Sequence, residues 1–155
     1  MVSEVEVTNR SAVDWALLIA RIIVGVVFMM HGSQKLFGAL GGPGLAGTVQ
    51  MMGPLGYLVT IGEFFGGLGL IVGFLSRFSA AAIIVIMLGA IAMVHGKNGF
   101  FMNWMAKQAG EGFEYHLLAI AVLSTILIAG PGRYAIGRFL PLPKRRLERP
   151  IAVLE

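Results

Sequence analysis

Two ionisable residues interrupt long apolar runs of this sequence. Arg21 lies inside the run 15–30, and Glu63 lies near the middle of the run 55–75. Because a charge in hydrocarbon costs about 2.5–3.5 kcal/mol on insertion scales, such residues face a bundle interior and pair with a partner. Their opposite charges predict an ion pair between Arg21 and Glu63. The simpler interpretation is a pair that fixes helix register. A buried carboxyl group that exchanges protons would instead make both residues candidates for catalysis.

A second group of polar residues is expected to gather at one end of the apolar runs. His31 and Lys35 lie one helical turn apart, so both can face one pocket. Glu114, Tyr115 and His116 open the last apolar run at a similar depth. Imidazole donates hydrogen bonds and exchanges protons near neutral pH. These residues are therefore the candidate binding site for an amphipathic ligand, with His31 also a candidate for catalysis. The alternative is a polar network that only holds helix ends together.

Metal or haem binding by the three histidines, His31, His95 and His116, is a further alternative. They come from three predicted helices, but no two share the i, i+4 spacing of a helical ligand pair, and no acidic run accompanies them. We therefore predict no metal site. The sequence contains no cysteine, which excludes disulfides, thiolate chemistry and iron–sulfur clusters within this chain.

The composition is that of an integral membrane protein. The chain has 155 residues, of which 57% are hydrophobic and only 13% are charged, and its mean hydropathy is +0.82. A soluble domain of this size carries about twice that share of charged residues. The net charge of +4 comes largely from the C-terminal tail and does not indicate nucleic-acid binding.

Four apolar segments approach the ~20 residues that cross a bilayer as a helix. The sequence therefore predicts an all-α fold, a four-transmembrane-helix bundle, with a tight hairpin at Ser76 and Arg77 between the second and third spans. This membrane domain covers residues 15–140, between an N-terminal segment, 1–14, and a basic tail, 141–155. The predicted spans are residues 15–35, 55–75, 78–94 and 115–130.

The two longer loops also carry apolar residues, at 45–52 and at 100–105. We expect both outward loops to fold back as short interfacial helices over the outer end of the bundle. Aromatic residues at such positions are typical of interfacial anchors. The loops then either anchor the protein at the membrane surface or form a lid over a pocket open to lipid.

Basic residues predict the orientation, because they concentrate on the cytoplasmic side. We therefore expect both termini in the cytoplasm. The acidic N-terminus does not resemble a secretory signal, so the first span is expected to be retained. The tail is expected to lie on anionic headgroups or to act as a topology signal. One side carries Arg10, Arg77, Arg133, Arg138, Lys144, Arg145, Arg146 and Arg149, and the other Lys35, Lys97 and Lys107.

Helical spacing also predicts which faces of the first two spans are buried. Arg21, Gly25, Phe28, Gly32 and Lys35 recur every three or four residues, so this stripe should face the bundle interior. In the second span, small residues at the same spacing should let another helix approach closely. These residues are Gly62, Gly66, Gly69 and Gly73, with Gly67 beside them.

Several of these residues together form a pattern that resembles the DoxX family. The resemblance covers roughly residues 16–138 and implies a four-helix membrane protein in the cytoplasmic (inner) membrane of a bacterium or archaeon. Family members include a small subunit associated with a terminal quinol oxidase and with thiosulfate:quinone oxidoreduction, and others linked to quinone detoxification or oxidative-stress complexes. The matching elements are Arg21, His31-Gly32, Lys35-Leu36-Phe37-Gly38, Glu63, Gly66-Gly67, Gly73, Arg77 and Glu114-Tyr115.

The resemblance implies a protein that works in or beside a quinone-linked respiratory or oxidative-stress redox complex. The amphipathic ligand would then be a quinone or quinol bound near His31, with no redox cofactor intrinsic to the chain. Partners would be membrane lipid and a larger membrane complex or a homo-oligomer. The alternatives are a non-catalytic accessory subunit and a small proton-coupled carrier that uses Glu63. Because the chain has no cysteine, thiol chemistry of any relative does not carry over.

Overall fold

The computed structural model describes residues 4–139, and all regular structure within that range is helical. The predicted basic tail, 141–155, lies outside the described residues. The five α-helices are α1 (Glu4–Phe37), α2 (Gly44–Met52), α3 (Leu55–Val72), α4 (Ser76–Ala90) and α5 (Glu114–Ala129). Shorter turns are Ala39–Gly41, the π-helical Ile91–His95, Gly96–Asn98 and Ile136–Arg138.

The predicted all-α membrane bundle is confirmed. Three helical segments are long and apolar enough to cross a membrane: Arg10–Phe37, Leu55–Val72 and Ser76–Asn98. The fourth, α5, is apolar but has only 16 residues, which at 1.5 Å per residue covers about 24 Å. Many large apolar side chains point outward, as expected of helices that lie in lipid.

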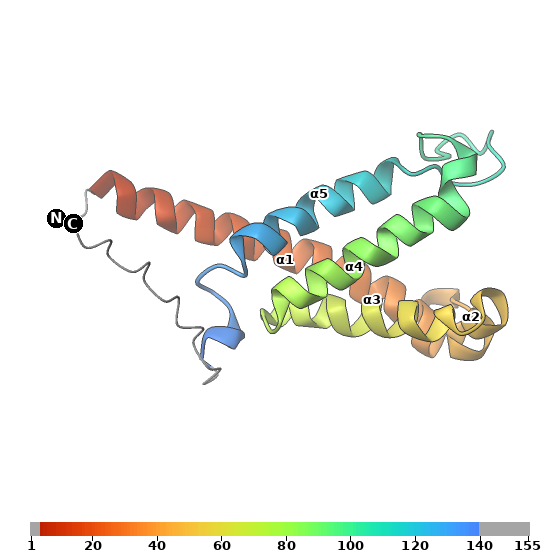
Figure 1. Cartoon of the computed structure of the whole chain (residues 1–155), viewed down its shortest axis with the longest axis horizontal. Helices are drawn as coiled ribbons and strands as arrows, with labels where there is room; N and C mark the ends of the chain where they lie inside the picture. The colour runs from red at the N-terminus through yellow and green to blue at the C-terminus, as the bar shows by residue number, and fades with distance from the viewer. Residues whose placement is uncertain (1–3, 140–155) are drawn as a thin grey trace, which may run out of the picture.

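The helices form two pairs, α1 with α3 and α4 with α5. Figure 1 shows these pairs diverging from the level of the α3–α4 hairpin toward the loops at the other end. The long helix α1 packs most extensively on α3, and α4 packs on both α3 and α5. The predicted tight hairpin between α3 and α4 is confirmed, although its link is residues 73–75 and Ser76 and Arg77 already belong to α4. These two helices separate as they leave the hairpin. The separation creates room between α3 and α4 at the end opposite the hairpin.

Glycines set the close contact between α1 and α3. A Cβ atom added to Gly25 would lie 2.8 Å from the Gly67 carbonyl oxygen, and one added to Gly32 would lie 2.5 Å from the Cα of Phe64. Neither position therefore has room for a side chain, and the two backbones approach as in other small-residue interfaces of membrane helices. The predicted interior stripe of α1 is confirmed at these positions.

The glycines of α3 serve two neighbours rather than one. Gly67 faces α1, whereas Gly62 and Gly69 face α4, where added Cβ atoms would lie 2.5 Å from Ile86 Cδ1 and 2.7 Å from Ser79 Oγ. Gly73 ends α3 with a φ of 75°, a conformation that glycine adopts without strain. The sequence predicted close packing, and the structure assigns it to two different faces.

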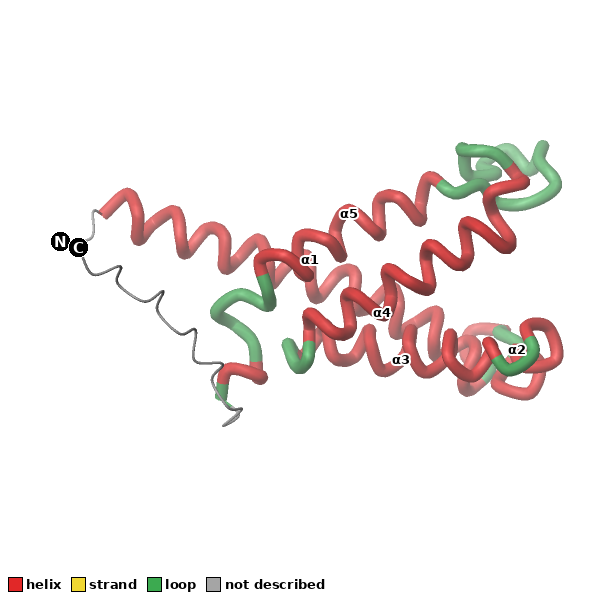
Figure 2. Tube along the Cα trace, viewed as in Figure 1, coloured by secondary structure: helices red, strands yellow, loops and turns green. Residues whose placement is uncertain are grey.

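Only one of the two longer loops forms the expected α-helix. The first loop contains α2, which packs against α3 and α1. The second loop, 99–113, contains no helix and runs as an irregular segment (Figure 2). Glu111 explains the difference, because its carboxylate accepts a hydrogen bond from the Asn103 backbone at 2.6 Å and its carbonyl accepts one from Asn98 at 3.0 Å. Side-chain bonds of this kind compete with helical ones.

Candidate functional site

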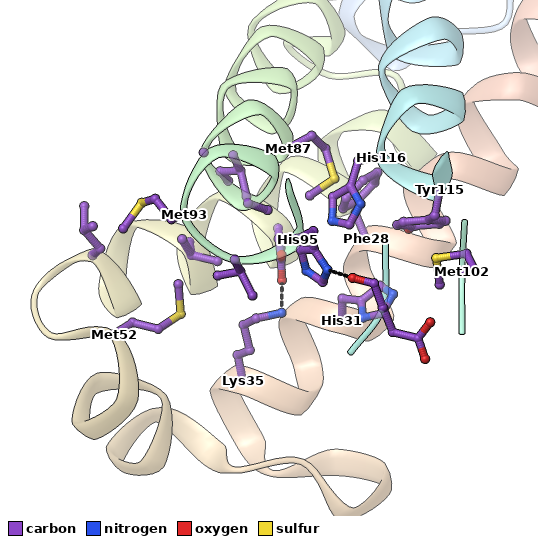
Figure 3. Close-up of a pocket in the computed structure, with 18 residues that line it drawn as sticks. Phe28, His31, Lys35, Met52, Met87, Met93, His95, Met102, Tyr115 and His116 are labelled. Atoms are coloured by element: carbon purple, nitrogen blue, oxygen red, sulfur yellow. Dashed lines mark hydrogen bonds and ion pairs between the residues drawn. The ribbon is translucent and has the colours of Figure 1, made fainter. Parts of the chain in front are cut away.

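A pocket of about 560 Å³ lies where α3 and α4 diverge (Figure 3). Its walls come from α1, α3, α4, α5, the end of α2 and the second loop. Most of its lining is apolar, including the four methionines Met52, Met87, Met93 and Met102. Flexible thioether side chains adapt to irregular apolar ligands. Both longer loops thus contribute to the pocket wall, through Met52 and Met102.

An ion pair between Lys35 and Glu63 forms the polar part of the pocket on the side of α1 and α3. The Lys35 ammonium donates to the Glu63 carboxylate at 2.6 Å, and the Glu63 side chain is 6% exposed. The predicted Arg21–Glu63 ion pair is therefore wrong, although the prediction that Glu63 is buried and paired is confirmed. Lys35 reaches it because α1 and α3 run antiparallel, with Gly32 against Phe64.

Arg21 does not line the pocket, and its hydrogen bonds go to backbone carbonyls instead. Its guanidinium is fully buried and donates to the carbonyls of Leu70 at 2.7 Å, Ile71 at 3.3 Å and Tyr134 at 2.6 Å. Leu70 and Ile71 lie in the last turn of α3, where carbonyls lack the usual i+4 partners, although the Gly73 backbone donates to the Leu70 carbonyl at 3.3 Å. The prediction that Arg21 is a catalytic residue of this site is not supported, since it caps α3 and ties it to the segment after α5.

Three histidines and a tyrosine form the other polar wall of the pocket. The rings of His95 and His116 lie 4.2 Å apart, and Tyr115 lies 5.5 Å from His116 and 6.3 Å from His31 between ring centroids. Figure 3 shows His31, His95 and His116 directed into the same space. The predicted convergence of His31, Lys35, Tyr115 and His116 is thus observed.

Two buried polar atoms of this wall have no partner among the described residues. They are the Tyr115 hydroxyl oxygen and Nδ1 of His116. An unpaired buried polar group costs about 1–3 kcal/mol, so a ligand that bonds to either atom would recover this cost. Both residues line the pocket, so a polar group that enters it lies beside these side chains.

Glu114 does not belong to this site. It lies outside the lining of the pocket, and its carboxylate accepts a hydrogen bond from the Trp104 indole at 3.3 Å. Glu114 is the first residue of α5, so its side chain turns toward the loop while Tyr115 and His116 turn inward. The structure therefore does not bring Glu114 together with the other predicted ligand-binding residues.

His95 and Glu111 line the pocket but were not among the predicted ligand-binding residues. The ring Nδ1–H of His95 donates to the Glu111 carbonyl at 2.9 Å, which leaves Nε2 as the acceptor of the neutral ring. His95 ends the π-helical turn Ile91–His95, a distortion often found at functional sites. The only signal in the sequence was the histidine itself at the end of a span. Within the described residues, no group of three His, Asp or Glu side chains is placed to share a metal ion.

Comparison with known proteins agrees with this architecture. The sequence model of the DoxX family matches residues 16–96, more than half of the chain. The chain belongs to the DoxX family. Two relatives of this DoxX protein are each 30% identical to it: "Inner membrane protein YqjF" of Escherichia coli (strain K12) and "Putative oxidoreductase CatD" of Bacillus subtilis (strain 168). The first match covers 82% of this chain and 93% of the relative, and the second 81% and 82%. No solved structure matches the chain significantly.

The family match includes α1, α2, α3, α4 and the π-helical turn, so it covers most of the pocket. Tyr115 and His116 lie after the matched residues but within a helix that completes the pocket. The resemblance that the sequence indicated is confirmed, and the protein is a membrane protein of this family.

Proposed function

We propose that this DoxX protein binds a quinone or quinol in the pocket and acts in or beside a quinone-linked respiratory or oxidative-stress redox complex. The observation that carries the proposal is the unpartnered Tyr115 hydroxyl and His116 Nδ1 on one wall of an apolar pocket. A quinone has an apolar ring and tail and two carbonyls that accept hydrogen bonds, so it fits both parts of the lining. The name of the Bacillus relative, which contains "oxidoreductase", supports a redox role.

The polar residues of the pocket supply what quinone chemistry needs. Reduction of a quinone to a quinol takes up two electrons and two protons. We assign proton exchange to His31, His95 and His116. We assign to the Lys35–Glu63 ion pair the role of holding a fixed pair of charges beside the quinone headgroup. The electrons come from a partner protein, and the chain contributes binding, orientation and protons.

Gly89 offers a direct test because it lines the pocket from α4 and a Cβ atom added there meets nothing within 4 Å. Gly89→Leu should fill the pocket without clashing with the protein, and it should reduce quinone retained on purification about tenfold or more. His31→Ala should also weaken retention. Solvent extraction and chromatography of the purified protein measure this quantity.

Gly89→Ala and Lys97→Ala are the matched controls, since the first adds only a methyl group and the second removes a cation outside the pocket lining. Both should retain quinone. Normal quinone content in Gly89→Leu and His31→Ala would contradict the proposal. Loss of a co-purifying complex with quinone still bound would instead support the accessory-subunit alternative.

We also propose that the end of the bundle carrying Arg10, Arg77, Arg133 and Arg138 faces the cytoplasm. The chain has no cysteine, so single introduced cysteines report cleanly. Lys107→Cys should react with a membrane-impermeant maleimide added outside intact cells, while Arg133→Cys should react only after the cells are opened. The reverse pattern would invert the orientation.

A further inference from the structure

A second hollow, of about 720 Å³, lies at the end of the molecule opposite the pocket. Three segments that are distant in sequence form it: residues 10–17 of α1, the start of α4, and the chain from the end of α5 onward. Each segment contributes one arginine, Arg10, Arg77 and Arg138 in turn. We call this feature the arginine hollow. No part of it lines the pocket assigned above to quinone.

The arginine hollow has an excess of positive charge. The Arg77 guanidinium donates one hydrogen bond, from Nη2 to the Ile128 carbonyl at 2.9 Å, which leaves further N–H groups for a ligand. Arg138 makes no side-chain hydrogen bond among residues 10–139 that the structure describes. The one acidic residue of the lining, Asp14, already accepts a hydrogen bond from the Arg133 backbone at 2.7 Å. An anion would therefore be attracted here.

The rest of the hollow is suited to a lipid. Val13 and Leu17 bring apolar side chains to its wall. Beside it, the rings of Trp15 and Tyr134 lie 4.8 Å apart, and such aromatic residues mark the level of lipid headgroups. A phospholipid meets the basic groups with its phosphate and the apolar wall with the start of its acyl chains, whereas a free phosphate uses only the basic groups.

A turn with little side-chain bulk allows Arg77 to reach this position. Gly130 has a φ of 88°, and a Cβ atom added to it would lie 3.3 Å from Nε and Nη2 of Arg77. The guanidinium thus lies directly against the turn that ends α5. This placement holds its charge at the wall of the hollow.

From these contacts we propose that the arginine hollow binds the phosphate group of an anionic phospholipid. Basic pockets at the ends of membrane helices recognise such headgroups. Each basic residue near the membrane surface contributes a similar amount to the attraction. The site is independent of quinone binding, because the two cavities share no lining residue.

The test is a titration of the full-length protein in a non-ionic detergent, with bound lipid counted by native mass spectrometry. Phosphatidylglycerol should bind more tightly than phosphatidylcholine. Arg138→Gln should weaken phosphatidylglycerol binding about fivefold, and Arg77→Gln with Arg138→Gln about thirtyfold. Arg77 also caps α5, so its substitution could weaken binding through the helix end. The single variant Arg138→Gln leaves that cap in place, so its loss of binding reports the site itself.

Lys97→Gln with Lys107→Gln is the control that removes the same charge from the other end of the molecule. It should bind phosphatidylglycerol as the unaltered protein does. Equal losses in the control and the arginine variants would overturn the proposal, since the attraction would then be non-specific. Competition by millimolar inorganic phosphate that removes the lipid completely would also overturn it, because the site would then recognise a free anion.

Discussion

Arg21→Met should destabilise the bundle by about 3 kcal/mol, because it removes the three hydrogen bonds that the guanidinium donates to the carbonyls of Leu70, Ile71 and Tyr134. The methionine side chain fills much of the same volume, so the loss reports hydrogen bonds more than packing. Thermal or denaturant unfolding of the purified protein in detergent gives the free energy of unfolding. Because Arg21 lies outside the pocket lining, quinone bound per folded molecule should not change.

Arg77→Met is the matched control for this loss. Arg77 also donates to a carbonyl at the end of a helix, Ile128 of α5, but it is exposed and makes one such bond. Its substitution should cost about 1 kcal/mol or less.

A second comparison tests the corrected pairing. Arg21→Met combined with Glu63→Leu should be less stable than Arg21→Met alone, because Lys35 then loses its partner. Recovery of stability in the double variant would restore the Arg21–Glu63 pair.

Gly32→Ala should destabilise the protein by about 2 kcal/mol or more, although the same change in an ordinary helix is stabilising. The added Cβ atom would lie 2.5 Å from the Cα of Phe64, where backbone rather than a flexible side chain must move. The α1–α3 interface would have to open along its length. The measurement is again the free energy of unfolding in detergent.

Gly89→Ala is the same substitution at a position where the added Cβ atom meets nothing within 4 Å. It should leave stability unchanged or raise it by up to about 1 kcal/mol. If Gly32→Ala and Gly89→Ala had equal effects, close approach of α1 and α3 would not be what these glycines provide.

The sequence by itself determined the fold class and which polar residues are buried. Long apolar runs can satisfy their backbone groups in lipid only as helices, so the number and approximate positions of the four long apolar helices followed from the sequence. Burial of Arg21 and Glu63, which are 0% and 5% exposed, followed from the cost of placing a charge in hydrocarbon. The spacing of His31 and Lys35 likewise placed both side chains in one pocket, as observed.

The partners of these charges were decided by the tertiary structure. Glycine contacts between α1 and α3 fix an antiparallel register in which Gly25 meets Ile71 and Gly32 meets Phe64. In this register Arg21 lies beside the end of α3, and Lys35 lies beside Glu63. Opposite charges on neighbouring helices indicated an ion pair. Which residues pair depends on how far along the bundle each one lies, and only the register of the two helices sets that.

Tertiary structure also decided the irregular parts of the site. Glu111 accepts bonds from three surrounding residues and holds the second loop out of helical conformation. His95 enters the pocket from a π-helical turn, and Glu114 turns away from it toward Trp104. Helical periodicity predicts side-chain directions only where the helix is regular. At the ends of α4 and α5, long-range hydrogen bonds replace that periodicity and set which side chains face the ligand.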